Sequence, residues 1–546
     1  MKKLVIALGV ALLCSVSSVF ASDFNTLVPR PAEMAQGVTS VELKPGMSVS
    51  APAEFVAEAE SFVAAVNVAT DLNATTVAAD GFVSLAKNDA IEAEGYSMTI
   101  SSKGVDIQAS TAAGAFYALQ TIKQLMGANV LAGKKADAST KYALPVGTVN
   151  DRPRFEYRGF MLDVSRHFFT ADEIKKMLDL MAVYKLNRFH WHLTDDQGWR
   201  LPIKKYPKLT VEGATNSNIL RTDFEQQKQW REGEDVVYGP FAYTPEEIHD
   251  IVAYAKARHI QVIPEIDMPG HMVAAIHAYP EFSTDPKSKK LAVHEDFSHK
   301  IWNKGGVSRD VLDVSNPKAM RFIKDVIDEL AVYFPYEYIH IGGDECPTLA
   351  WEHSKSCQKL MKKLGLKDVR ELQSWFTKEV ADYALNTHGR KIIVWNEVIT
   401  EPNANMDVIK DINPIVFCWL GGEQKAEANG LRHVYTPFNG GWYINRSYEG
   451  VDKHGAGRDG SLKKSITVMP PLHDNLIGVQ GTFWTEQVDR PEDLEYLALP
   501  RLIGVAEQGW SVQVQKDYDE FLDRVIKQRQ YLDLGGYNYG AHQLQK

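Results

Sequence analysis

The chain has 546 residues, of which 45% are hydrophobic, 24% charged and 10% aromatic. These are globular proportions, and they exclude a disordered, collagen-like or coiled-coil chain. The formal net charge is −10, and Lys and Arg form no basic block. We therefore expect no nucleic-acid partner, and a neutral substrate in an acidic cleft fits the composition better.

Residues 1–21 have the pattern of a secretory leader. Lys2 and Lys3 precede an apolar stretch, and Val19-Phe20-Ala21 ends it. The stretch is too short to span a membrane, so we expect cleavage after Ala21 and an exported, periplasmic or secreted protein. No other long apolar run predicts a membrane span. The leader holds two lysines and no acid, so its removal changes the net charge to −12.

Three cysteines remain after residue 21. Export permits a disulfide between Cys346 and Cys357, which would close a short loop. Cys418 lies in an apolar run and is interpreted as a small buried hydrophobic residue. Neither the number nor the spacing of the cysteines indicates a zinc site, and we expect no metal or cofactor.

Residues 22–151 are predicted to form a small α+β domain. Their clearest unit is 94–126, where alternating residues are followed by a helical pattern, which indicates a strand pair and an amphipathic helix. The polar, proline-containing segment 150–159 marks the predicted domain boundary.

From residue 152 to 546 the pattern changes to strand and helix in alternation. The expected strands are 159–165, 186–193, 260–266, 336–343, 391–397, 414–420, 433–437 and 477–484, and the clearest helices are 170–185, 244–259, 316–334 and 369–389. Eight apolar strands with intervening helices predict a closed (β/α)₈ TIM barrel followed by a C-terminal helical segment. An open doubly wound sheet is the alternative. No helix is evident in 438–475, which is Gly-rich and polar.

Asp344 and Glu345 follow the fourth expected strand. Neighbours within a strand face opposite ways, but after Gly342-Gly343 both carboxylates can turn toward one site at the C-terminal rim of the barrel. A carboxyl pair suits glycoside cleavage, with Glu345 as the acid because the Asp344 anion would raise its pKa. A solvated acidic turn and a metal site are the alternatives.

Other rim positions carry residues that could bind a sugar. Trp395, Trp419 and Trp484 each end a different strand, and three such rings can enclose the apolar face of a sugar. Tyr443 lies in a glycine-flanked stretch that could present it inward. Arg166 ends the first strand, where it could bind two sugar hydroxyls or form a rim ion pair.

Asp195 and His271 end the second and third strands. A carboxylate that holds an imidazole beside a catalytic acid would tune the pKa of that acid. His190 and His192 share one face of a strand and resemble metal ligands, but without an evident third ligand we interpret them as residues of the barrel interior.

Taken in order, seven motifs resemble those of the β-N-acetylhexosaminidases of glycoside hydrolase family 20. They are LDVSRHF, FHWHLTDDQGWR, PEIDMPGH, HIGGDE, VWNE, WYINRSY and FWTE. The similarity runs through most of 152–512, and the first domain resembles the small N-terminal domain of that family. It implies a retaining exo-hydrolase that releases terminal N-acetylglucosamine or N-acetylgalactosamine from an oligosaccharide or glycoconjugate.

The resemblance also implies a role for each matching residue. The 2-acetamido oxygen of the substrate would attack the anomeric carbon and give an oxazolinium ion, with Glu345 as general acid/base and Asp344 accepting the acetamido N–H. Tyr443 would bind the acetamido oxygen inside a wall formed by Trp395, Trp419 and Trp484. Arg166 and Glu486 would hold the outer hydroxyls, and Asp195 with His271 would support Glu345.

Members of the family carry Asp or Asn at the position of Asn445, and Arg446 follows it here. An Asp would repel an anionic group near the sugar C6, whereas Asn-Arg would not. We therefore expect some tolerance of 6-sulfated N-acetylhexosamines. Two other functions stay open: a catalytically silent sugar-binding protein, and a metal-dependent deacetylase that uses His190 and His192. The sequence does not give the oligomeric state.

Overall fold

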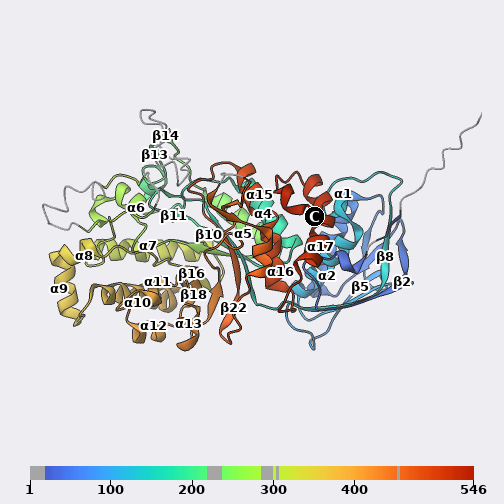
Figure 1. Ribbon diagram of the computed structural model, residues 1–546, viewed down its shortest axis with the longest axis horizontal. Helices are drawn as coiled ribbons and strands as arrows, with labels where there is room; N and C mark the ends of the chain where they lie inside the picture. The colour runs from blue at the N-terminus through green and yellow to red at the C-terminus, as the bar shows by residue number, and fades with distance from the viewer. Residues whose placement is uncertain (1–18, 22, 218–236, 285–298, 303–305, 452–454) are drawn as a thin grey trace, which may run out of the picture. The chain divides into compact units, whose positions relative to one another are not determined.

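A computed structural model describes residues 19–21, 23–217, 237–284, 299–302, 306–451 and 455–546 (Figure 1). The chain divides into two compact units, one of Met1–Leu27 with Glu33–Asn150 and one of Val28–Ala32 with Asp151–Lys546. Of the expected leader, only Val19–Ala21 lies within the described residues, as strand β1. None of the helices in these described ranges combines the length and the apolarity that a membrane crossing requires.

The first unit contains an eight-stranded sheet in the order β1-β8-β6-β7-β5-β3-β4, with β2 paired to β8. Its further elements are β2 (Glu33–Leu43), β3 (Ser48–Ser50), β4 (Thr75–Val77), β5 (Val83–Lys87), β6 (Tyr96–Ser101), β7 (Gly104–Ala109), β8 (Lys141–Asp151), α1 (Val56–Ala69), α2 (Ala112–Met126) and α3 (Ala128–Ala132). Strands β6 and β7 are antiparallel and α2 packs on both, which confirms the strand pair and helix expected in 94–126.

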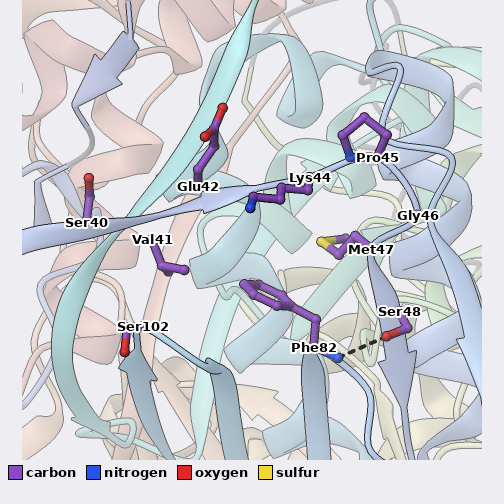
Figure 2. A pocket seen from close by; sticks show the side chains of 10 residues that line it. All are labelled: Ser40, Val41, Glu42, Lys44, Pro45, Gly46, Met47, Ser48, Phe82 and Ser102. Atoms are coloured by element: carbon purple, nitrogen blue, oxygen red, sulfur yellow. Dashed lines mark hydrogen bonds between the residues drawn. The ribbon is translucent and has the colours of Figure 1, made fainter.

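A surface pocket of about 450 Å³ opens on this unit between the ends of β2 and β3 (Figure 2). Its charged lining residues are Glu42 and Lys44, and its one aromatic lining residue is Phe82, whose backbone N–H donates to the hydroxyl of Ser48. A single carboxylate cannot supply the carboxyl pair expected of the catalytic site. That pair lies in the second unit.

The second unit contains a closed barrel of eight parallel strands in the order β10-β15-β16-β17-β18-β19-β22-β9. The strands are β9 (Tyr157–Asp163), β10 (Arg188–His192), β15 (Gln261–Glu265), β16 (Tyr338–His340), β17 (Lys391–Trp395), β18 (Ile415–Cys418), β19 (His433–Tyr435) and β22 (Leu476–Phe483). The pairing of β22 with β9 closes the sheet. This confirms the TIM barrel and excludes the open doubly wound alternative.

The four expected helices form α4 (Ala171–Val183), α5 (Pro245–Lys256), α7 (Pro317–Tyr333) and α10 (Val369–His388). Helix α4 begins with a complete capping box between Thr170 and Glu173, as its sequence predicts. The remaining helices are α6 (Val273–Ala278), α8 (Leu349–His353), α9 (Lys355–Leu364), α11 (Glu397–Thr400), α12 (Met406–Ile412), α13 (Glu423–Ala428), α14 (Leu462–Thr467), α15 (Pro491–Ala498), α16 (Arg501–Trp510) and α17 (Tyr518–Leu534).

Between β19 and β22 the chain forms a short parallel pair and one helix of two turns. The pair is β20 (Arg446–Tyr448) with β21 (Ala456–Gly460), and the helix is α14. Two further short pairs, β11 (Thr194–Asp195) with β12 (Gly198–Trp199) and β13 (Asn216–Ser217) with β14 (Val237–Tyr238), also lie outside the barrel. The segment without an evident helix is therefore mostly loop, which places side chains at the barrel rim.

The barrel is filled by apolar and aromatic side chains, among them Ile263, Ile393 and Phe417. Cys346, Cys357 and Cys418 are buried free thiols, so the disulfide that export would permit is not formed in this structure. Cys418 is fully buried and packs as a small hydrophobic group, as expected.

Candidate active site

The two acids of the pair lie at the end of β16 in different environments. Gly342 and Gly343 have φ of +64° and +90°, a left-handed backbone that glycine adopts without strain. This turn brings Asp344 and Glu345 to the same rim. Asp344 is buried, whereas the side chain of Glu345 is 47% exposed. One carboxyl is thus embedded in the protein, and the other is accessible to a ligand.

Asp267 lies beneath Asp344. Its Oδ1 accepts the backbone N–H of Gly343 at 3.0 Å, and its carboxyl hydrogen-bonds Asp344. Burial raises the pKa of Asp267 to about 8 and raises that of Asp344 well above its usual value. Both carboxyls therefore hold a proton more tightly than an exposed aspartic acid does. The sequence patterns did not single out Asp267, although it lies in the PEIDMPGH motif.

His271 connects Asp195 to the acid pair. Its Nδ1 lies 2.9 Å from Asp195 Oδ1, and its Nε2 lies 3.6 Å from Glu345 Oε2 and 3.8 Å from Asp344 Oδ2. Burial alone would lower the pKa of His271, but the Asp195 carboxylate outweighs it and raises that pKa well above the usual value. The imidazole is therefore protonated beside Glu345.

The expected pKa direction for Glu345 is wrong. The charged imidazole of His271, whose Nε2 lies 3.6 Å from Glu345 Oε2, lowers the pKa of Glu345. The neighbouring Asp344, which was expected to raise the pKa of Glu345, is itself buried against Asp267, and its own pKa is raised. A cation in contact with Glu345 therefore sets its proton affinity more strongly than the adjacent acid does.

Arg166 follows the end of β9 and is almost fully buried. Its Nη2 lies 2.6 Å from Asp195 Oδ2, its Nη1 3.2 Å from Asp163 Oδ2, and its Nε donates to Gln197. These contacts form the rim ion pair that the sequence left open. The charge of Arg166 also opposes the burial that raises the pKa of Glu486, so the two expected sugar-binding residues lie near each other.

The three tryptophans and Tyr443 lie in two aromatic pairs. The rings of Trp395 and Trp484 have centroids 6.0 Å apart, and those of Trp419 and Tyr443 are stacked at the same separation. Tyr443 is held by a bridge to Thr482 of β22, so the irregular segment before it is anchored to the barrel. Burial raises the pKa of Tyr443 well above its usual value, which keeps its hydroxyl a donor.

Two glutamate side chains fix two of the indole rings. Trp395 Nε1 donates to Glu265 at 2.7 Å, and Trp419 Nε1 donates to Glu397 at 2.9 Å. Burial raises the pKa of Glu397 to about 8. The sequence patterns did not single out either acid, although Glu265 is the next-to-last residue and Glu397 the last residue of a predicted strand, and this position at a strand end could have indicated them.

Glu265 also contacts the two histidines of β10. Besides Trp395 Nε1, its carboxylate lies 2.6 Å from His192 Nδ1, 2.9 Å from His190 Nε2 and 3.0 Å from His340 Nδ1. His192 Nε2 in turn lies 3.0 Å from Asp195. His190 and His192 are both fully buried. A catalytic metal needs a coordination position open to water, so this interior cluster does not fit a deacetylase centre.

Asn445 and Arg446 lie next to Tyr443 in the chain. Asn445 is buried, and its Oδ1 has no hydrogen-bond partner among the described residues. Arg446 Nε bonds the Asp459 carboxylate, and the guanidinium lies 4.8 Å from the centre of the Phe438 ring. The charge of Arg446 is thus partly neutralised by Asp459, a partner that the sequence did not indicate.

Comparisons with known proteins agree with this arrangement. The model of the glycosyl hydrolase family 20 catalytic domain matches residues 155–513, and the model of domain 2 of that family matches 25–152. A β-hexosaminidase of Porphyromonas gingivalis is 39% identical over 82% of this chain, and the match spans 55% of that protein's length. A β-N-acetylhexosaminidase of Cellulomonas fimi is 32% identical over 82% of this chain and 80% of that protein.

Solved structures give the same result. The family 20 exo β-N-acetylglucosaminidase of Vibrio harveyi, in complex with N-acetylglucosamine, matches with a TM-score of 0.80 at 28% identity and covers 95% of this chain and 78% of its own. The N-acetyl-β-hexosaminidase of Streptomyces plicatus, in complex with Thio-NAglucal, matches with a TM-score of 0.75 at 28% identity over 96% of this chain and 98% of its own.

Proposed function

The chain belongs to glycosyl hydrolase family 20, and we propose that it is an exo-acting β-N-acetylhexosaminidase. It hydrolyses terminal N-acetylglucosamine or N-acetylgalactosamine from oligosaccharides or glycoconjugates. The observation that carries the proposal is the pairing at the end of β16, where a half-exposed Glu345 contacts His271 and a buried Asp344 contacts Asp267. One carboxyl can exchange a proton with a ligand, while the other is held in place to orient it.

Substrate-assisted catalysis fits the different environments of the accessible Glu345 and the buried Asp344. Glu345 donates its proton to the leaving oxygen as the bond from that oxygen to C1 breaks, and the acetamido oxygen forms a bond to C1. An oxygen of Asp344 accepts the acetamido N–H, while Asp267 holds the same Asp344 carboxyl from the protein side. Water, deprotonated by Glu345, opens the oxazolinium ion and restores the β-configuration. An intramolecular nucleophile held in line has an effective molarity of about 10⁵ M or more.

To donate a proton, Glu345 needs a higher pKa than the one that the charged His271 imidazole gives it. A bound sugar covers the exposed face of Glu345 and removes water from it. Desolvation raises the pKa of a carboxylic acid, so binding favours the protonated form that the first step needs.

The surrounding residues hold the sugar. Trp395, Trp419 and Trp484 form the wall around the acetyl group, and Tyr443, whose hydroxyl stays protonated, donates to the acetamido oxygen. Arg166 uses the donors left free by its bonds to Asp163 and Asp195 for the outer hydroxyls, together with Glu486.

Hydrolysis of p-nitrophenyl N-acetyl-β-glucosaminide tests the proposal, with the plain p-nitrophenyl β-glucoside as control. Rapid release from the first and none from the second supports an acetamido nucleophile. Binding without release would indicate a silent sugar-binding protein. Free acetate as product, lost on chelation, would indicate a deacetylase.

Chitooligosaccharides or glycans are the proposed natural substrates, and the protein is proposed to act after export to the periplasm or medium. The leader pattern of residues 1–21 supports export. N-terminal sequencing of the protein recovered outside the cytoplasm should begin at Ser22, and an intact Met1 there would contradict cleavage. Comparing rates on chitobiose and on a glycoprotein glycan tests the substrate class.

A further inference from the structure

We propose that Glu427, His433 and His473 form a binding site for a divalent transition-metal ion, specifically Zn²⁺, at the amino-terminal end of the barrel. Each of the three offers one ligand atom, and these atoms all lie within 4.8 Å of one another. His433 begins β19 and pairs with Leu476, which begins β22. The acid pair lies at the opposite, carboxyl-terminal end of the strands, so this cluster is separate from the site described above.

The hydrogen bond of His433 prepares its ring to bind a metal. His433 is buried, and its Nδ1 lies 3.1 Å from the backbone oxygen of Leu431. A carbonyl oxygen can only accept, so Nδ1 carries the proton and Nε2 presents a lone pair. Histidine ligands of metal ions are held by this kind of bond on the nitrogen that does not ligate.

The spacing of the two imidazoles matches a shared ion. His433 Nε2 and His473 Nδ1 are 3.2 Å apart, and the ring centroids are 5.3 Å apart. Two nitrogens that bind tetrahedral zinc at about 2.0–2.1 Å are separated by about 3.3 Å. The same distance also suits a single N–H···N bond in the empty site. An ion therefore replaces one proton on His473 with little movement of either ring.

Glu427 completes the cluster from helix α13. Its Oε1 and Oε2 accept the backbone N–H groups of Asp474 and Asn475 at 3.2 and 3.1 Å. These bonds hold both oxygens of the carboxylate in place. They also fix the loop that carries His473 onto α13. Each carboxylate oxygen keeps a lone pair for a third ligand bond.

The site has an entry path and a fourth position. Leu472, next to His473, is 77% exposed, so the loop borders solvent. A water molecule that enters from this side supplies the fourth ligand. An ion here would join α13, β19 and the segment before β22, and so stabilise the barrel without entering catalysis.

Zinc titration of the whole protein, by calorimetry and by thermal unfolding, tests the site. His473→Gln is the decisive variant because His473 is only partly buried, and Leu472→Ala is the control for changes in the same loop. We expect the wild type and Leu472→Ala to bind Zn²⁺ with a rise in Tm. We expect His473→Gln to bind at least about tenfold more weakly with no such rise.

Hydrolysis of the aryl N-acetylglucosaminide, measured in parallel, locates the bound ion. Zn²⁺ at the proposed site leaves the rate unchanged, whereas an ion on the acid pair inhibits. Absorption of bound Co²⁺ in the wild type should show tetrahedral geometry and should be absent in His473→Gln. Equal affinity in wild type and His473→Gln, or binding seen only as inhibition, would overturn the proposal.

Discussion

The carboxylate of Asp267 occupies the space that a side chain at Gly342 would need, since a Cβ atom placed on Gly342 would lie 1.8 Å from Asp267 Oδ1. The glycine before the acid pair therefore has two functions. It allows the left-handed turn at φ +64°, and it leaves room for the partner of Asp344.

Gly342→Ala should displace Asp267 and disturb Asp344. We expect a loss of stability of about 2–5 kcal/mol, from the left-handed backbone and the steric overlap together, and a kcat at least tenfold lower. Gly389→Ala is the matched control, because Gly389 has the same φ of +64° with nothing within 4 Å of the added Cβ. Urea unfolding of both variants separates the cost of the steric overlap with Asp267 from the cost of the left-handed backbone. Equal losses of unfolding free energy in the two variants would show that Asp267 does not limit the size of the side chain at position 342.

Glu345→Gln tests the proton donor. Only a poor leaving group needs a proton in the transition state. We therefore expect a loss of about 10²–10⁴-fold on chitobiose and a much smaller loss on a dinitrophenyl glycoside. Steady-state rates on the two substrates check this, and comparable losses on both would remove Glu345 from the acid role.

His271→Asn should change the pH profile in a defined direction. The charged imidazole lowers the pKa of Glu345, so its removal raises that pKa. The alkaline limb of kcat/KM reports loss of the acid proton, and it should therefore move to higher pH while the maximum falls. The exposed His353→Asn serves as control. A limb that stays in place or moves to lower pH would contradict the contact between His271 and Glu345.

The barrel could be predicted because parallel strands covered on both faces are near-continuous apolar runs, as in β17 and β18. The acids at the strand ends could be located because they directly follow these apolar runs. What the sequence could not provide was the partner of each acid. Asp344 and Glu345 are neighbours in the chain, yet Asp267 and His271, which set their proton affinities, come from another strand end. The expected pKa of Glu345 was wrong because it relied on adjacency along the chain.

The segment 438–475 is the other part that could not be predicted. Among its described residues the regular elements are only the short strands β20 and β21 and helix α14, and the segment is held by contacts with other parts of the chain. Examples are the bridge from Tyr443 to Thr482 and the bonds from Arg501 to the carbonyl oxygens of Gly440 and Ile444. Contacts of this kind depend on the closed barrel beneath them, so local sequence does not determine them.

Replacing Glu265 should lower the free energy of unfolding more than replacing any one of the side chains that contact it. Glu265→Gln removes a buried charge that faces three imidazoles and an indole, and we expect a loss of about 3–5 kcal/mol. Trp395→Phe removes a single charge-assisted hydrogen bond and should cost about 1.5–3 kcal/mol, as well as ring area. The exposed Glu337→Gln should change the unfolding free energy little. Chemical denaturation gives the order, and a loss in Glu265→Gln no larger than in Glu337→Gln would contradict the cluster.

The last prediction concerns 6-sulfated sugars and the pair of Arg446 with Asp459. Because Asp459 partly neutralises Arg446, the wild type should accept a 6-sulfate only moderately. Asp459→Asn frees the guanidinium and should raise kcat/KM on a 6-sulfated aryl N-acetylglucosaminide, relative to the unsulfated one, by about two- to fivefold. Arg446→Ala should lower that ratio by a similar factor, and both effects should shrink as salt is added. Because general damage to the site lowers kcat/KM on the sulfated and the unsulfated substrate alike, it does not change the ratio of the two values. Equal impairment by the sulfate in wild type and Arg446→Ala would show that Arg446 does not face the C6 group.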